Sequence, residues 1–182
     1  MKTLASCAVS LGLVLLMAPS PRAQVSPQVS KDTLAGVTNY AHVETTVACA
    51  GATTPASLAE IKRLGYKSVI NLREASEQGA DIDGESAAAK AAGINFVHLP
   101  FNTRMPDPML VDNFLKAITD PANVPAFIHC ASGNRAAAMW AIKRVEVDNW
   151  ETDRALAEAT DLGMTSAGMK TFVTDYVQAH KK

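Results

Sequence analysis

One ten-residue stretch, residues 126–135, constrains this chain more than any other part of its sequence. It reads Ala-Phe-Ile-His-Cys-Ala-Ser-Gly-Asn-Arg. The apolar run 124–128 predicts a buried strand, a small turn-prone loop follows it, and the alanine-rich run that Arg135 opens predicts a helix. A chain with this stretch has to form a strand, a tight turn and a helix in succession, with Cys130 at the turn.

A cysteine at such a turn is well placed for chemistry. The N–H groups of the loop and of the following helix N-terminus point at the sulfur, where they stabilise a thiolate or cradle an oxyanion. Gly133 permits a close approach of the backbone to a ligand, and the guanidinium of Arg135 matches phosphate or sulfate bidentately. The alternative is a buried structural cysteine followed by an arginine that merely starts a helix. We favour the functional interpretation, in which the anion is bound by the loop residues Ala131, Ser132, Gly133, Asn134 and Arg135.

The N-terminus carries the pattern of a secretory signal peptide. Lys2 precedes an apolar run at 8–17, and Ala23 offers a small residue for cleavage, so residues 1–23 are expected to be removed. The apolar run is too short to span a bilayer permanently, which predicts a periplasmic or secreted protein without stable membrane insertion. The chain has 182 residues, a net charge of -1 and no long charge run, so we expect one globular domain and no nucleic-acid partner.

Loss of the signal peptide leaves two cysteines, Cys49 and Cys130, in a compartment that permits disulfides. They form a structural disulfide, or Cys130 is the reactive thiol and Cys49 a bystander or resolving partner. We favour a free or reversibly oxidised Cys130. No Cys-x-x-Cys motif occurs and the histidines show no ligand spacing, so no metal or other cofactor is expected. The histidines are His42, His98, His129 and His180.

The remaining pattern alternates strands with helices. Residues 24–38 predict a flexible leader, and residues 39–182 a single domain. Expected strands are 39–49, 67–72, 94–99 and 124–128; expected helices are 54–63, 84–92, 109–118, 134–147, 152–161 and 166–180. This order predicts an α/β fold with a mostly parallel central sheet, helices on both faces and a helical C-terminal third. Ligands bind at the carboxyl ends of such strands, where the Cys130 loop lies. Arg73 and Glu74 follow another strand, and either reach this site or form a surface ion pair.

Several segments together resemble a known superfamily. They are Ser68-Val-Ile-Asn-Leu-Arg73 with an acidic loop after it, an alanine-rich helix that ends in Ala-Gly, Phe96-Val-His-Leu-Pro100 and His129-Cys-Ala-Ser-Gly-Asn-Arg135. From about Val43 to Gly163 the chain resembles the dual-specificity-type protein tyrosine phosphatases, within them the bacterial beta-lactamase-hydrolase-like phosphatases, which are also described as possible sulfurtransferases.

The resemblance implies a cysteine-dependent phosphatase mechanism. Cys130 would attack phosphorus as the thiolate and form a phosphocysteine, while Arg135 and the loop amides bind the phosphoryl oxygens. His129 would favour the thiolate through a hydrogen-bond network, or is only a satisfied histidine at a strand end. Asp107, in a proline-rich loop, is the candidate general acid, or alternatively caps the helix that follows Pro108. The implied substrate is a phosphorylated protein or a small-molecule phosphate ester.

Two departures from the family pattern keep other functions open. Four residues separate Cys130 from Arg135 where the phosphatase loop usually has five, and Ala136 lacks the hydroxyl that usually follows the arginine. A shorter loop suits a rhodanese-like sulfurtransferase that carries a persulfide on Cys130. A non-catalytic anion-binding module is the third interpretation. We rank the phosphatase interpretation first because the phosphatase-like pattern extends over more of the chain.

Overall fold

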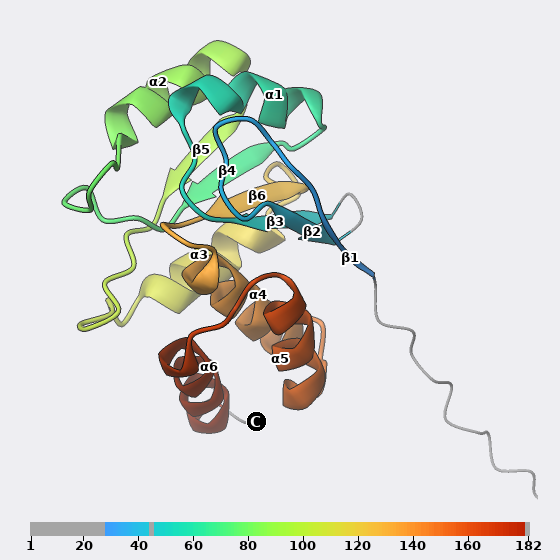
Figure 1. Ribbon diagram of the computed structural model, residues 1–182. Helices are drawn as coiled ribbons and strands as arrows, with labels where there is room; N and C mark the ends of the chain where they lie inside the picture. The colour runs from blue at the N-terminus through green and yellow to red at the C-terminus, as the bar shows by residue number, and fades with distance from the viewer. Residues whose placement is uncertain (1–27, 44–45, 181–182) are drawn as a thin grey trace, which may run out of the picture.

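The computed structural model of the chain describes residues 28–43 and 46–180 (Figure 1). The predicted signal peptide, residues 1–23, lies outside this range, as do residues 24–27 of the predicted leader. No helix among the described residues is both long enough and apolar enough to cross a membrane.

The centre of the fold is a six-stranded sheet in the order β1-β2-β3-β6-β4-β5. Its strands are β1 (Val29–Lys31), β2 (Ala41–Val43), β3 (Val47–Ala50), β4 (Ser68–Asn71), β5 (Asn95–His98) and β6 (Ala126–His129). The β3–β6, β6–β4 and β4–β5 pairs are parallel, and the β1–β2 and β2–β3 pairs are antiparallel. The predicted α/β class with a mostly parallel sheet is confirmed.

Helices cover both faces of this sheet, as Figure 1 shows. They are the short 3-10 helix η1 (Pro55–Ser57), α1 (Leu58–Arg63), α2 (Ile82–Ala92), α3 (Leu110–Thr119), α4 (Asn134–Glu146), α5 (Thr152–Asp161) and α6 (Ala167–Ala179). One face carries α1 and α2, and the other carries α3 to α6. Two apolar clusters follow this division, one beneath each layer of helices. The helical C-terminal third packs as α5 and α6 against α4.

Strand β6 lies at the middle of the sheet, and all four of its residues are buried. Because side chains alternate along a strand, its residues divide between the two clusters. Phe127 packs in the cluster beneath α1 and α2. Ile128 and Cys130 pack in the cluster on the other face, beneath α4. The alternation therefore directs the thiol to the α4 face and His129 to the α2 face.

The predicted leader is wrong for residues 28–38. Val29–Lys31 forms the edge strand β1, Leu34 is buried, and Val37 forms bridges with Leu34 and Thr53. These apolar residues occur singly between polar ones, so they show no helical or strand period. Their contacts come from the sheet and from the turn after β3, which local sequence does not reveal.

The predicted strand 39–49 is also wrong as a single element. It is an antiparallel pair, β2 and β3, in which Ala41 lies opposite Cys49. Asn39, just before β2, has a left-handed backbone with φ 50°, a conformation that asparagine tolerates better than most residues. Because the chain reverses between β2 and β3, this end of the sheet, strands β1 to β3, is antiparallel.

Candidate active site

The Cys130 loop is held from outside by the neighbouring chain. Ala52 N donates to Ala131 O at 3.0 Å, and Asn39 Nδ2 donates to Ser132 O at 3.1 Å. Because both carbonyls are hydrogen-bonded to neighbouring residues, the N–H groups of the loop can face the sulfur. Gly133 N donates to Cys130 Sγ at 3.1 Å. Gly133 has φ 95° and caps the N-terminus of α4, a conformation that a side chain would strain.

The thiol of Cys130 therefore lies at the positive end of the 13-residue helix α4. Only 1% of the residue is exposed. A helix N-terminus with a backbone donor on the sulfur stabilises the thiolate, the reactive form. This is the arrangement that the strand, turn and helix pattern predicts.

Cys49 is a separate free thiol on the same face of the sheet, and it is opposite Ile128 in the β3–β6 pair. The structure contains Cys49 and Cys130 as free thiols, not as a disulfide. Burial, followed by the neighbouring Cys130 and Glu158, raises the pKa of the Cys49 thiol well above its ordinary value. Cys49 is therefore held as the neutral thiol and is unsuited to be the nucleophile.

Arg135 is fixed by three acceptors. Its Nη1 donates to Leu72 O at 3.0 Å and to Phe101 O at 2.9 Å, and the carboxylate of Glu77 binds Nη1 and Nη2 at 2.6 and 2.7 Å. No oxygen of the described residues accepts from Nε. The guanidinium edge that carries Nε is thus left for a ligand, and a bidentate anion needs one such edge. Cys130 lies close enough to this guanidinium to help raise its pKa.

The electrostatics of the Arg135–Glu77 pair favour the charged form of both residues. Burial lowers the pKa of Arg135, but the hydrogen bond that it donates to Glu77 and the nearby Cys130 outweigh burial, so the pKa is raised. Burial likewise raises the pKa of Glu77, yet the hydrogen bonds from Arg135 and Glu74 outweigh it and the pKa is lowered. Arg135 is a fixed cation beside the sulfur.

Arg73 does not form the surface ion pair that was the alternative, because its side chain is 3% exposed; its Nε instead pairs with Glu77 Oε2 at 3.4 Å. Its Nη1 donates to Gly79 O and its Nη2 to Gln78 O, and these bonds hold the loop between β4 and α2. Glu74 reaches the 100–108 loop by accepting from Asn102 Nδ2 at 3.1 Å. Arg73 therefore positions Glu77, and through Glu77 it supports Arg135.

His129 faces away from the thiol, toward α2. Its Nε2 lies 2.9 Å from Glu85 Oε2, and both side chains are buried, at 0% and 1% exposure. Asn71 Nδ2 donates to the same carboxylate oxygen at 2.9 Å. The approach of Glu85 Oε2 to His129 Nε2 is not aligned as a hydrogen bond, and neither ring nitrogen of His129 has a hydrogen-bond partner among the described residues. His129 joins β6 to α2 and contacts Cys130 only through the backbone.

Glu85 is a residue that sequence reasoning missed, and we expect Glu85→Ala to destabilise the protein. It would leave His129 and Asn71 without their buried partner and open a cavity, which together cost about 3 kcal/mol of unfolding free energy. Urea denaturation measures this. The matched control is Asp83→Ala, an exposed acidic residue in the same first helical turn. Equal stability of the two variants would contradict the role of Glu85.

Asp107 forms its hydrogen bonds within the turn before α3. Its Oδ1 accepts from Met109 N at 2.8 Å, and its carbonyl accepts from Leu110 N. It lines a groove with Phe172 and Tyr176 of α6. Asp107 thus closes the turn that leads into α3, whose N-cap position is Met109. Within the described residues no group of three or more His, Cys, Asp or Glu side chains could hold a metal ion.

The sequence and the fold were compared with known proteins. The sequence model of the beta-lactamase hydrolase-like protein, phosphatase-like domain, matches residues 39–147, more than half of the chain. A search of curated protein sequences gave no significant match.

Solved structures of similar fold are phosphatases. A candidate phosphatase (DUF442) from Shewanella putrefaciens is 19% identical, with a TM-score of 0.66 over 81% of this chain and 94% of that one. TpbA of P. aeruginosa is 22% identical, with a TM-score of 0.61 over 78% and 84%. The PP-IP phosphatase SIW14 of S. cerevisiae, in complex with citrate, is 19% identical, with a TM-score of 0.61 over 78% and 87%.

These comparisons agree with the geometry of the loop. They lend no support to the rhodanese-like alternative, because the matching family is phosphatase-like and the structures named are phosphatases. The chain belongs to the beta-lactamase hydrolase-like phosphatase family, with the phosphatase-like domain at residues 39–147.

Proposed function

We propose that this protein is an exported, cysteine-dependent phosphatase that hydrolyses phosphate monoesters through a phosphocysteine at Cys130. The observation that carries the proposal is the thiol at the N-terminus of α4, with the Nε edge of Arg135 left open beside it. Export rests on the signal-like pattern of residues 1–23. TpbA has been crystallised with pTyr and SIW14 is a PP-IP phosphatase, which supports a phosphorylated protein or small phosphate ester as substrate.

In the first step the thiolate of Cys130 attacks phosphorus. The S–P bond forms as the ester P–O bond breaks, and the leaving oxygen takes a proton. Arg135 and the loop N–H groups bind the non-bridging phosphoryl oxygens and offset the charge that develops on them. In the second step water attacks phosphorus and the S–P bond breaks, which restores the thiolate and releases inorganic phosphate; the proton that water loses returns to the group that protonated the leaving oxygen.

The proton donor is tested at Asp107. If Asp107 is the general acid, the variant Asp107→Asn can no longer protonate the leaving oxygen. The change would be seen in the pH profile of kcat/KM with an aryl phosphate, whose limb for the acid would flatten. An unchanged profile with a lower thermal stability would leave Asp107 only its structural role in the turn before α3.

The experiment that tests the reaction uses two substrates under reducing conditions. Phosphate release from p-nitrophenyl phosphate is measured beside thiocyanate formation from thiosulfate and cyanide. Phosphate release without thiocyanate formation supports the proposal. Thiocyanate formation alone would overturn it in favour of a sulfurtransferase. A rise in thermal stability with phosphate, without turnover of either substrate, would show an anion-binding module.

A further inference from the structure

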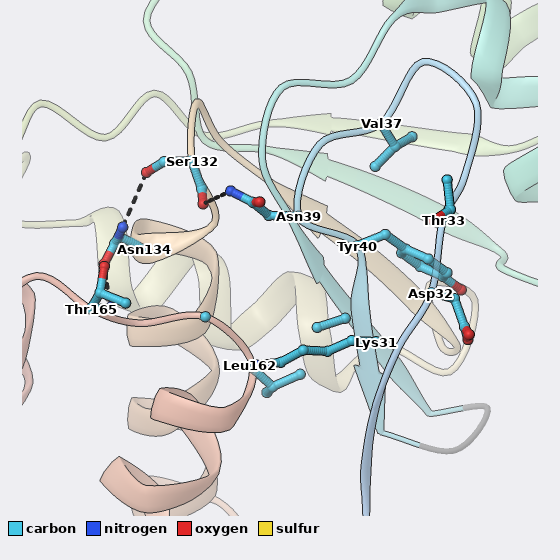
Figure 2. Close-up of a pocket in the computed structure, with 12 residues that line it drawn as sticks. Lys31, Asp32, Thr33, Val37, Asn39, Tyr40, Ser132, Asn134, Leu162 and Thr165 are labelled. Atoms are coloured by element: carbon cyan, nitrogen blue, oxygen red, sulfur yellow. Dashed lines mark hydrogen bonds between the residues drawn. The ribbon is translucent and has the colours of Figure 1, made fainter.

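The Cys130 loop and the arginine that follows it are held by different parts of the chain. Figure 2 shows the outer side of the loop, where Asn39 Nδ2 donates to Ser132 O and Asn134 Nδ2 donates to Ser132 Oγ at 3.2 Å. These contacts fix the loop, but they do not include the guanidinium of Arg135. That group is held by two other loops, which follow β4 and β5. The orientation of its Nε edge therefore depends on how these two loops are joined to each other.

A side-chain hydrogen bond joins the two loops. Asn102 Nδ2, in the loop after β5, donates to Glu74 Oε1, in the loop after β4, at 3.1 Å, and both residues are half-buried. Asn102 directly follows Phe101, whose carbonyl accepts from Arg135 Nη1. Glu74 N donates at 2.8 Å to Glu77 Oε1, the oxygen that also accepts from Arg135 Nη1. The contacts therefore close a ring that consists of Arg135, Glu77, Glu74, Asn102 and Phe101.

Asn102 has a second contact, within its own loop. Its Oδ1 accepts from the backbone N–H groups of Arg104 and Met105 at 2.9 and 3.2 Å, which closes a turn. The side-chain amide is thus used on both sides: the oxygen shapes the 100–108 loop, and the nitrogen ties this loop to Glu74. An amide supplies both an acceptor and a donor, whereas a carboxylate at the same position would supply acceptors only.

We propose that Asn102 and Glu74 are a positioning pair for the phosphatase reaction, whose hydrogen bond joins the two loops that hold Arg135 and so keeps its Nε edge aligned for the phosphoryl oxygens. The inference rests on the proposed phosphatase activity. Both residues act through Arg135, because Glu74 fixes the Glu77 carboxylate and Asn102 fixes the segment that supplies Phe101 O. Since a bidentate contact requires a set orientation of the guanidinium, loss of the pair weakens phosphate binding in the substrate complex and in the transition state.

Asn102→Asp separates the two contacts of this residue. Aspartate keeps the oxygen that closes the turn, but it donates no hydrogen bond and places a second carboxylate against Glu74. The kcat/KM for p-nitrophenyl phosphate should fall roughly tenfold, through a higher KM as well as a lower kcat. Adding Glu74→Gln restores the hydrogen bond in reverse, because the glutamine amide can donate to the new carboxylate. The double variant should therefore recover to within about threefold of wild-type protein.

Glu74→Met breaks the same hydrogen bond from the other side and adds no charge. The turn closed by Asn102 and the backbone contact of residue 74 with Glu77 remain, so a similar loss in KM and kcat is expected. Glu74→Gln alone should lose less than Glu74→Met, because its amide oxygen can still accept from Asn102 Nδ2. Asn113→Asp, at an exposed position of α3, adds the same charge as Asn102→Asp and should leave kcat/KM unchanged.

The kinetics are measured well below the unfolding midpoint of each protein, so that loss of folded protein is separated from loss of alignment. Loss of folded protein lowers the apparent kcat and leaves KM as it is. An unchanged KM in both Asn102→Asp and Glu74→Met would therefore overturn the positioning role. The absence of any recovery in the double variant, or an equal loss in Asn113→Asp, would overturn it as well.

A binding measurement separates this inference from the proposed reaction. If wild-type protein does not hydrolyse p-nitrophenyl phosphate, the phosphatase proposal fails, and inorganic phosphate becomes the probe. The rise in thermal unfolding midpoint with phosphate should be smaller in Asn102→Asp and Glu74→Met than in wild-type protein and Asn113→Asp, and the double variant should regain it. The same rise in all of these proteins would show that the pair does not align Arg135.

Discussion

Replacing Cys130 by serine should lower kcat/KM for aryl phosphates by a factor on the order of 10³ or more. The serine hydroxyl keeps the place of the sulfur beneath Gly133 N, but at neutral pH it is not ionised as a thiolate can be. The variant should retain phosphate binding, because Arg135 and the loop N–H groups remain. Phosphate release and the phosphate-induced rise in unfolding midpoint measure the two properties separately.

The control for this variant is Cys49→Ala. Cys49 is a buried thiol whose raised pKa keeps it neutral, so the substitution should leave kcat/KM within about twofold and lower the stability by about 1 kcal/mol. Activity that survives in Cys130→Ser, or that is lost equally in Cys49→Ala, would show that Cys130 is not the nucleophile. The pair also separates loss of chemistry from loss of packing on the same face of the sheet.

The core of the site could be predicted because it is contiguous in the sequence. Cys130, Gly133 and Arg135 lie within six residues, and the strand, turn and helix around them are set by local apolar pattern and glycine. The order of parallel strands also follows from the alternation of elements. These features need no knowledge of distant contacts.

The supporting residues could not be predicted in the same way. Glu77 follows β4 and binds an arginine 58 positions later, which depends on how the loop before α2 folds. Glu85 had a usable signal, because it shares the buried face of the alanine-rich α2 with Ala89. A carboxylate on an apolar helix face requires a buried partner. That partner, His129, is set by the side-chain alternation of β6.

The role of Arg135 leads to the second large effect. Arg135→Lys should lower kcat/KM by about 10²- to 10³-fold, because one ammonium cannot bind Glu77 and also offer a bidentate edge to phosphate. Lysine also lacks the planar fork with which Nη1 and Nη2 bind the two oxygens of Glu77. The loss should appear in kcat as well as in KM, since phosphoryl charge builds up in the transition state. Steady-state kinetics with p-nitrophenyl phosphate measure both.

Glu77→Gln distinguishes a support for Arg135 from a competitor of phosphate. The Glu77 carboxylate has a lowered pKa, so its contribution to stability is present above its ordinary titration range and is lost as pH falls through the lowered pKa. Between about pH 6 and pH 3 the stability of Glu77→Gln should therefore change less than that of wild-type protein. If Glu77 supports Arg135, Glu77→Gln should lower kcat/KM roughly tenfold. The loss is limited because the carbonyls of Leu72 and Phe101 still hold the guanidinium. Tighter phosphate binding with undiminished kcat would instead show that the carboxylate competes with the substrate for Arg135.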